Sequence, residues 1–131
     1  MPNPKNIKIL LIEDDPFLLN MYSTKFEIED FQIITADNGE NGLKKLFEKK
    51  PDIVLLDILM PKMNGFEVLE HIQKSDNEDI KKIPIILLTN LNQQEDIERG
   101  MKLGAIDYVI KAHFMPSEVV GKINRVLENK K

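Results

Sequence analysis

Several acidic residues and one lysine follow the apolar runs of this sequence, at the points where strands would end. The run at residues 53–56 (IVLL) ends in Asp57, and a proline and an Asn-Gly pair follow within a few residues. A short apolar run bounded by turn signals is typical of a strand buried on both faces. A carboxylate at its end lies beside low-dielectric surroundings, where an isolated charge is costly. Asp57 is therefore the first candidate for chemistry.

Three other apolar runs end in polar residues. These runs lie at residues 7–12, 83–89 and 106–110. The carboxyl ends of parallel strands meet at one edge of a sheet. We therefore expect one crevice to hold, besides Asp57, the side chains of Glu13, Asp14, Asp15, Thr89 and Lys111.

This set of groups is suited to phosphoryl chemistry. Adjacent carboxylates resist joint ionisation, and a hard divalent cation removes that problem. Oxygen ligands without His or Cys select Mg²⁺ or a relative such as Mn²⁺. Asp57 is then a natural nucleophile that forms an aspartyl phosphate. Lys111 and the cation would neutralise the phosphoryl charge, and the Thr89 hydroxyl can donate a hydrogen bond to a phosphoryl oxygen.

The segments between these runs carry helical patterns. Asp15 and Pro16 are typical of an N-cap and a first helical residue, so Asp15 is interpreted as a cap rather than a ligand. Asn64 with Glu67 predicts a capping box at the start of another helix. The first helix has apolar residues at helical spacing, namely Phe17, Leu18, Met21, Tyr22 and Phe26. We predict further helices at 38–50, 93–103 and 116–128, a weaker strand at 31–36 and a polar loop at 75–82.

The predicted fold is a doubly wound parallel sheet. Five strands alternate with five helices, a pattern that places helices on both faces of the sheet. The first, third and fourth strands are the most continuously apolar and should be central. The order 2-1-3-4-5 satisfies this and is the flavodoxin-like order, with a ligand crevice at the carboxyl ends of the first and third strands. Residues 1–131 are predicted to form a single domain.

Composition narrows the function classes. The chain has 131 residues, no cysteine and a formal net charge of −4, which argues against direct nucleic-acid binding. No apolar run approaches the roughly 20 residues that would span a bilayer. The N-terminus lacks the apolar core of a signal peptide. We therefore expect a cytoplasmic protein without membrane or nucleic-acid contacts.

Four motifs together resemble the receiver domain of two-component response regulators, including chemotaxis regulators. They are "LLIEDD", "LLDILMPKMNG", "ILLTN" and "GAIDYVIKAHF", and the resemblance covers nearly the whole chain. By position it implies that Asp57 is the phosphoacceptor and that Glu13 and Asp14 are the acidic pair. Asp14 would bind the metal ion directly and Glu13 through water. The backbone carbonyl of Leu59 would be a further metal ligand.

The same resemblance implies a switch and a set of partners. Thr89 matches the switch hydroxyl, Tyr108 the switch aromatic residue and Lys111 the phosphate-binding lysine. A histidine kinase or phosphotransfer protein would supply the phosphoryl group. A downstream protein target, or an output domain that this chain lacks, would receive the signal. Such a domain promotes its own aspartyl phosphorylation and dephosphorylation and does not turn over a separate substrate.

One position departs from the family pattern. Receiver domains usually have a proline after the lysine, often in a cis peptide, whereas Ala112 follows Lys111 here. A cis bond before a non-proline residue costs about 2.5–4 kcal/mol, which favours a trans peptide. The segment from Ala112 to Met115 is also one residue longer than usual.

Three other functions are compatible with parts of this pattern. A phosphatase of the haloacid dehalogenase type needs a second Asp two residues after the nucleophile, where this chain has Leu59. A flavodoxin-type FMN module needs a hydroxyl-rich phosphate loop, whereas the acidic residues after the first strand would repel phosphate unless a metal intervened. The third is a receiver that binds partners without phosphorylation, and the retention of Asp57, Thr89 and Lys111 argues against it.

Overall fold

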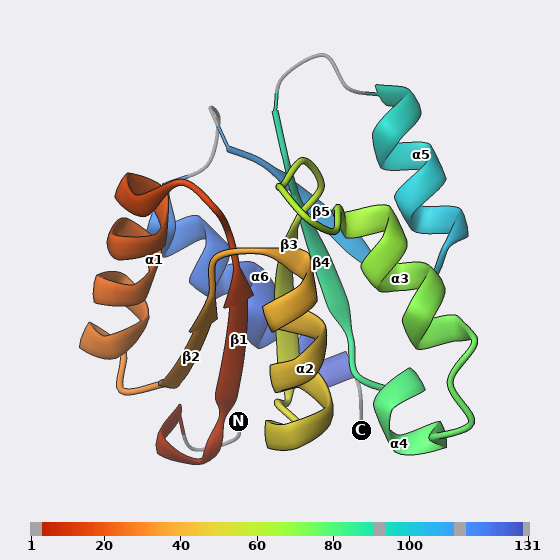
Figure 1. Ribbon diagram of the computed structural model, residues 1–131. Coiled ribbons are helices and arrows are strands. Elements are labelled where there is room, and N and C mark those ends of the chain that lie inside the picture. Colours follow the sequence, from red (N-terminus) through yellow and green to blue (C-terminus); the bar gives the residue numbers. More distant parts are fainter. Residues whose placement is uncertain (1–3, 91–93, 112–114, 130–131) are drawn as a thin grey trace.

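The computed structural model describes residues 4–90, 94–111 and 115–129 and contains a five-stranded parallel sheet. The strands are β1 (Lys8–Ile12), β2 (Gln32–Ala36), β3 (Ile53–Asp57), β4 (Ile85–Thr89) and β5 (Asp107–Ile110). Their order is β2-β1-β3-β4-β5 (Figure 1), which confirms the predicted order. The strands begin and end within two residues of the predicted limits.

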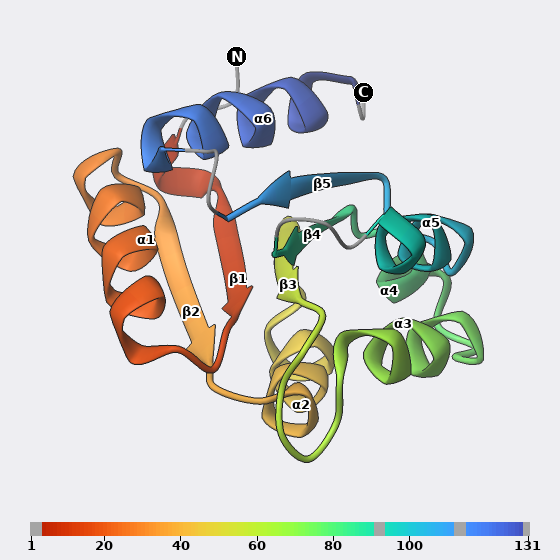
Figure 2. The same ribbon diagram turned by 90° about the horizontal axis from the view of Figure 1, so that it is seen from above.

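Helices cover both faces of the sheet. They are α1 (Pro16–Ile28), α2 (Gly39–Lys49), α3 (Gly65–Gln73), α4 (Glu78–Lys81), α5 (Gln94–Lys102) and α6 (Pro116–Asn129), and a 3-10 turn, η1 (Pro4–Asn6), precedes β1. Figure 2 shows α1 and α6 on one face and α2, α3 and α5 on the other. This is the doubly wound architecture that the alternating pattern predicted.

The sheet separates two apolar clusters, because neighbouring residues of a strand point to opposite faces. In β1, Leu10 and Ile12 face the cluster under α2 and α3, whereas Ile9 and Leu11 face the cluster under α1 and α6. Every residue of β3 and β4 is buried. The edge strands β2 and β5 are largely half-buried, so the assignment of central and edge strands from apolar content is confirmed.

The prediction of a polar loop at 75–82 was wrong, because this segment contains α4. The Asn77 side chain caps the helix by accepting a hydrogen bond from the Ile80 amide at 3.2 Å. Ile80 is only 1% exposed and packs into the cluster on the α3 side. One buried apolar residue among polar neighbours has no helical period, so pattern alone could not reveal this short helix. The described part of the chain thus has six α-helices rather than five.

The predicted helix starts are confirmed, but one residue of α1 was misplaced. Asp15 accepts a hydrogen bond from the Phe17 amide at 2.9 Å, and Asn64 forms the capping box with Glu67. Phe17 was expected on the buried face of α1, yet it is 73% exposed. It precedes Tyr22 by five residues, about 140° around a helix with 3.6 residues per turn. The buried stripe instead follows Tyr22 and Phe26.

Candidate functional site

The strand ends place the polar residues at one edge of the sheet. Asp57 is the last residue of β3 and Thr89 the last of β4, while Glu13 and Lys111 directly follow β1 and β5. The Lys111 amide continues the ladder by donating a 2.8 Å hydrogen bond to the Thr89 carbonyl. The parallel register therefore brings together residues that are far apart in the sequence.

Lys111 bridges two buried carboxylates. Its Nζ atom lies 2.9 Å from Glu13 Oε2 and 3.0 Å from Asp57 Oδ1. Glu13 is fully buried, and the Lys111 side chain is only 11% exposed. Sequence reasoning placed all three residues in one crevice but did not foresee that Glu13 and Asp57 share the lysine. The order of the strands gave no information on this pairing, which depends on side-chain conformations.

The electrostatic setting of Asp57 follows from this arrangement. Burial, and then the negative charge of Glu13, raise the pKa of Asp57 from 3.8 to about 7, although Lys111 acts in the opposite direction. Burial alone would lower the pKa of Lys111, but its hydrogen bond to Glu13 and the charge of Asp57 outweigh this and raise it. The lysine thus stays charged and keeps the two carboxylates compatible at short range.

Three carboxylates could hold a metal ion. Glu13, Asp14 and Asp57 each offer an oxygen, and these oxygens lie within 4.8 Å of one another. Asp14 is exposed, whereas the other two are buried. Asp15 does not join them, because its side chain caps α1 as predicted. An all-oxygen set with a negative charge that one lysine only partly offsets fits a hard divalent cation such as Mg²⁺.

The remaining predicted residues surround this cluster. Thr89 is 1% exposed, and its hydroxyl lies 3.4 Å from the Asn90 carbonyl oxygen. Leu59 lies in the loop after β3, with its side chain 53% exposed. Tyr108 is half-buried against the cluster on the α3 side. The Lys122 ammonium lies 5.5 Å from the centre of its ring. Ala112 and the Lys111–Ala112 peptide lie outside the described residues.

Sequence reasoning missed one polar group near the cluster. Tyr22 was predicted as an apolar contact of the first helix, and its ring is indeed buried. Burial raises the pKa of its hydroxyl, the charge of Lys111 lowers this pKa and the charge of Glu13 raises it. The signal was a phenol, rather than an aliphatic side chain, on the buried face of the helix that follows the acidic residues.

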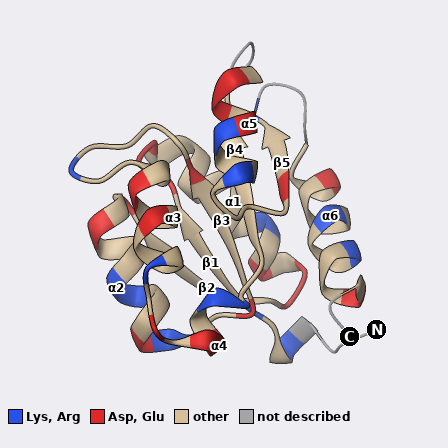
Figure 3. Ribbon diagram, turned by 90° about the vertical axis from the view of Figure 1, so that its right-hand side faces the viewer, with Lys and Arg blue, Asp and Glu red and all other residues tan. Residues whose placement is uncertain are grey.

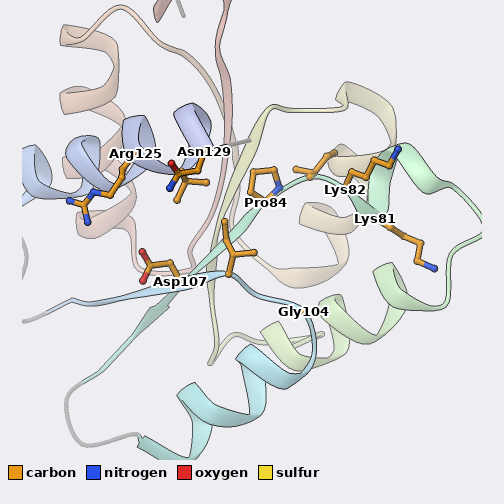
Figure 4. Close-up of a pocket in the computed structure, with 10 residues that line it drawn as sticks. Lys81, Lys82, Pro84, Gly104, Asp107, Arg125 and Asn129 are labelled. Carbon is orange, nitrogen blue, oxygen red and sulfur yellow. The ribbon is translucent and has the colours of Figure 1, made fainter. Parts of the chain in front are cut away.

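A cavity lies at the end of the sheet opposite the carboxylate cluster (Figure 4). This cavity of about 470 Å³ is lined by Lys81 and Lys82 at the end of α4 and by Arg125 and Asn129 of α6. Asp107, which also lines it, pairs with Lys122 at 2.9 Å. The cavity shares no residue with the carboxylate cluster and does not contribute to that site.

Fold and site together define a class of protein. A parallel sheet of this order, with carboxylates and a lysine at the carboxyl ends of β1, β3 and β5, is the flavodoxin-like architecture with its ligand crevice at the strand-order reversal. The chain belongs to the response regulator receiver domain family, whose model matches residues 9–124. It is thus a receiver domain of two-component response regulators, in agreement with the resemblance of its motifs.

Curated relatives and solved structures of response regulators are similar to this chain. The chain is 36% identical over 120 residues to the probable transcriptional regulator ycf27 of Guillardia theta, covering 92% of this chain and 45% of the relative. It is 34% identical to the alkaline phosphatase synthesis transcriptional regulatory protein PhoP of Bacillus subtilis, covering 93% and 49%. The receiver domain of Francisella response regulator 1452 superposes with a TM-score of 0.84 at 28% identity, covering 96% of this chain and 100% of that domain.

These comparisons also bear on the extent of the protein. The chain spans about half the length of the curated relatives it matches. Among residues 4–90, 94–111 and 115–129, no helix has the length and apolar character needed to cross a membrane.

Proposed function

We propose that this receiver domain, residues 1–131, accepts a phosphoryl group on Asp57 and thereby changes its binding to protein partners. The observation that carries the proposal is the position of the Asp57 carboxylate. It lies at a buried strand end, 3.0 Å from the Lys111 ammonium and beside two further carboxylates. No structural role of a strand-end aspartate calls for that set of neighbours, whereas phosphoryl transfer to a carboxylate uses all of them.

The transfer is a simple substitution at phosphorus. An Asp57 carboxylate oxygen forms a bond to phosphorus as the phosphorus–nitrogen bond of a phosphohistidine breaks, and the leaving imidazole takes up a proton. Lys111, already in contact with Asp57, would meet the negative charge of the phosphoryl oxygens. The same residues support a second substitution, in which water bonds to phosphorus as the bond to the Asp57 oxygen breaks and inorganic phosphate leaves, so the domain would promote its own dephosphorylation.

The cation in this proposal is Mg²⁺, or Mn²⁺ in its place. Asp14 and Asp57 would bind it directly, with the Leu59 carbonyl as a further ligand and Glu13 acting through water. When bound, the ion supplies positive charge that offsets both the carboxylates and the phosphoryl oxygens. The closeness of the three carboxylate oxygens and the absence of nitrogen or sulfur ligands among them support this assignment.

Thr89 and Tyr108 would carry the signal away from the site. The Thr89 hydroxyl can reach a phosphoryl oxygen on Asp57 only if the end of β4 moves. This movement vacates space beneath α5, and Tyr108 on the neighbouring strand can turn further inward to fill it. The signalling surface would then comprise α5, β5 and α6. The contact of Tyr108 with the cluster on the α3 side supports a ring that can move in this direction.

The partners follow from this chemistry. The donor would be a histidine kinase or a phosphotransfer protein in the cytoplasm. The recipient of the signal would be a downstream protein or an output domain linked to this one. Two relatives are named transcriptional regulators and are about twice as long as this chain, which favours a linked output domain over direct contact between the receiver and nucleic acid.

Phosphorylation by a small donor tests the proposal. The protein, incubated with acetyl phosphate and Mg²⁺, should gain the mass of one phosphoryl group by intact mass spectrometry. Asp57→Asn should abolish the gain, whereas Asp52→Asn, a control near the opposite end of β3, should preserve it. A phosphate that persists in Asp57→Asn would contradict the assignment. Partner binding that ignores phosphorylation of the wild-type protein would favour the alternative of a phosphorylation-independent interaction module.

A further inference from the structure

Tyr22 carries a buried hydroxyl without a hydrogen-bond partner among the residues that the structure describes. The residue is 0% exposed, and its ring stacks on Phe26 with the ring centres 6.1 Å apart. The ring packs into the apolar cluster between the sheet and helices α1 and α6. A phenylalanine would fill the same space, so packing accounts for the ring and leaves the hydroxyl unexplained.

The position of Tyr22 on α1 indicates in which direction its hydroxyl points. Side chains on an α-helix lean toward its N-terminus. Helix α1 begins at Pro16, just after the acidic residues, and runs beside β2 away from that edge of the sheet (Figure 1). By this geometry the tip of the Tyr22 ring would extend back toward the site. Burial raises the pKa of Tyr22, the charge of Lys111 lowers it and that of Glu13 raises it, so both charges act on the hydroxyl.

A buried polar group without a partner costs stability. Water in the unfolded chain satisfies the Tyr22 hydroxyl, and folding removes that water. The hydroxyl therefore lowers the stability of the unphosphorylated protein. Its presence is explained if it gains a hydrogen-bond partner when the site is phosphorylated.

Lys111 needs such a partner when the site changes state. Two of its three N–H bonds point to Glu13 and Asp57 in the unphosphorylated protein. Phosphorylation turns one Asp57 oxygen into the bridging oxygen of an acyl phosphate, a weaker acceptor, and draws the ammonium toward the phosphoryl group. The side chain is only 11% exposed, so bulk water cannot freely replace a lost contact.

We propose that Tyr22 is a positioning residue for Lys111, its hydroxyl accepting a hydrogen bond from the ammonium as the lysine turns from the Asp57 carboxylate to the phosphoryl group. The inference rests on the proposed phosphorylation of Asp57 and assigns a further residue to that site. The hydroxyl holds the ammonium in line during transfer and touches neither the metal ion nor the phosphoryl group.

Removal of the hydroxyl alone tests the inference. Tyr22→Phe should leave the thermal midpoint of the unphosphorylated protein unchanged or higher, because no hydrogen bond is lost there. It should lower the maximal rate of phosphorylation by acetyl phosphate about 5- to 20-fold, with little change in the donor concentration at half-maximal rate. Mg²⁺ affinity, measured by titration of the unphosphorylated protein, should stay the same.

Ser23→Ala is the matched control. Ser23 lies next to Tyr22 on α1, and its buried hydroxyl also lacks a partner among the described residues. Loss of this hydroxyl should leave the phosphorylation rate at its wild-type value, since the inference gives Ser23 no part in positioning Lys111. Equal rates in Tyr22→Phe and the wild type would overturn the inference while leaving phosphorylation of Asp57 intact. A fall of several degrees in the thermal midpoint of Tyr22→Phe would overturn it too, because the hydroxyl would then have a partner before phosphorylation. A wild-type protein that takes up no phosphate would remove the proposed function itself.

Discussion

Lys111 keeps two buried carboxylates compatible with each other, and the acidic site depends on it. Glu13 and Asp57 both lie within 3.0 Å of its ammonium group, and neither has appreciable access to water. An uncompensated buried charge is strongly destabilising, so each carboxylate relies on the shared lysine. A site of this kind lowers the stability of the unphosphorylated protein. Its negative charge favours the binding of a cation, which in turn favours a phosphoryl group.

The raised pKa of Asp57 makes stability depend on pH. With a pKa of about 7 in the folded protein against 3.8 as the ordinary value, Asp57 holds its proton over a range in which the unfolded chain has lost it. The contribution of Asp57 to the free energy of unfolding is therefore greatest below about pH 4. It declines as the pH rises toward 7 and is lowest above pH 7. Asp57→Asn mimics the protonated form. We expect the variant to gain about 1–4 kcal/mol over the wild type at pH 8 and almost nothing at pH 4, by denaturant unfolding without metal. The same gain at both pH values would contradict this account.

Asp14 and Asp15 are neighbours with different roles, and a pair of variants separates them. Asp14→Ala removes a carboxylate from the metal cluster, so Mg²⁺ affinity by titration calorimetry should fall at least roughly 10- to 100-fold. Asp15→Ala removes the cap of α1 and should cost about 1 kcal/mol of stability while leaving Mg²⁺ affinity nearly unchanged. Unchanged Mg²⁺ affinity in Asp14→Ala would exclude its role as a ligand.

Helix α5 contacts both the sheet and α3, and few of its residues are buried. Only Ile97 and Gly100 of this helix are buried, and Met101 is 38% exposed. A Cβ atom at Gly100 would lie 2.3 Å from Leu87 Cδ1, so glycine lets α5 approach β4 closely. The Arg99 guanidinium lies 4.2 Å from the centre of the Phe66 ring on α3. The helix also has acidic residues in its first turn and basic residues in its last turn (Figure 3), which suits the helix dipole.

The switch proposed for this element is tested at Thr89. Thr89→Ala should still take up phosphate on Asp57, because the hydroxyl is not the nucleophile. The variant should show smaller changes in backbone amide chemical shift on phosphorylation in β4, α5 and β5, since the end of β4 is no longer drawn toward the phosphoryl group. Heteronuclear NMR spectra of the two proteins with and without acetyl phosphate measure this. Shifts of full size in the variant would mean that Lys111, rather than the hydroxyl, drives the movement.

At the scale of the whole molecule, the fold was predictable because its signals are repeated. Apolar runs of strand length, caps such as Asp15 and Asn64, and polar strand ends all favour the same doubly wound sheet. The convergence of Asp57, Thr89 and Lys111 then follows from strand order alone. Features that depend on one side chain were not predictable, such as the burial of Ile80 in α4 or the Lys111 bridge, because neither has a period or a turn signal.

The layers of the molecule also differ in how readily they open, and this decides whether phosphorylation can move α5. Strands β3 and β4 are buried along their whole length between two apolar clusters, so their amides should exchange with solvent only through global unfolding. Helix α5 has two buried residues, whereas α6 has four: Val119, Val120, Ile123 and Leu127. We expect α5 amides to exchange at least about tenfold faster than those of β3, a difference of about 1.4 kcal/mol, with α6 in between. Low concentrations of denaturant should accelerate exchange in β3 but hardly in α5, because a local opening exposes little surface. If α5 instead matched β3 in rate and denaturant dependence, the helix would open only with the whole molecule, and the pull of Thr89 on β4 could not displace it.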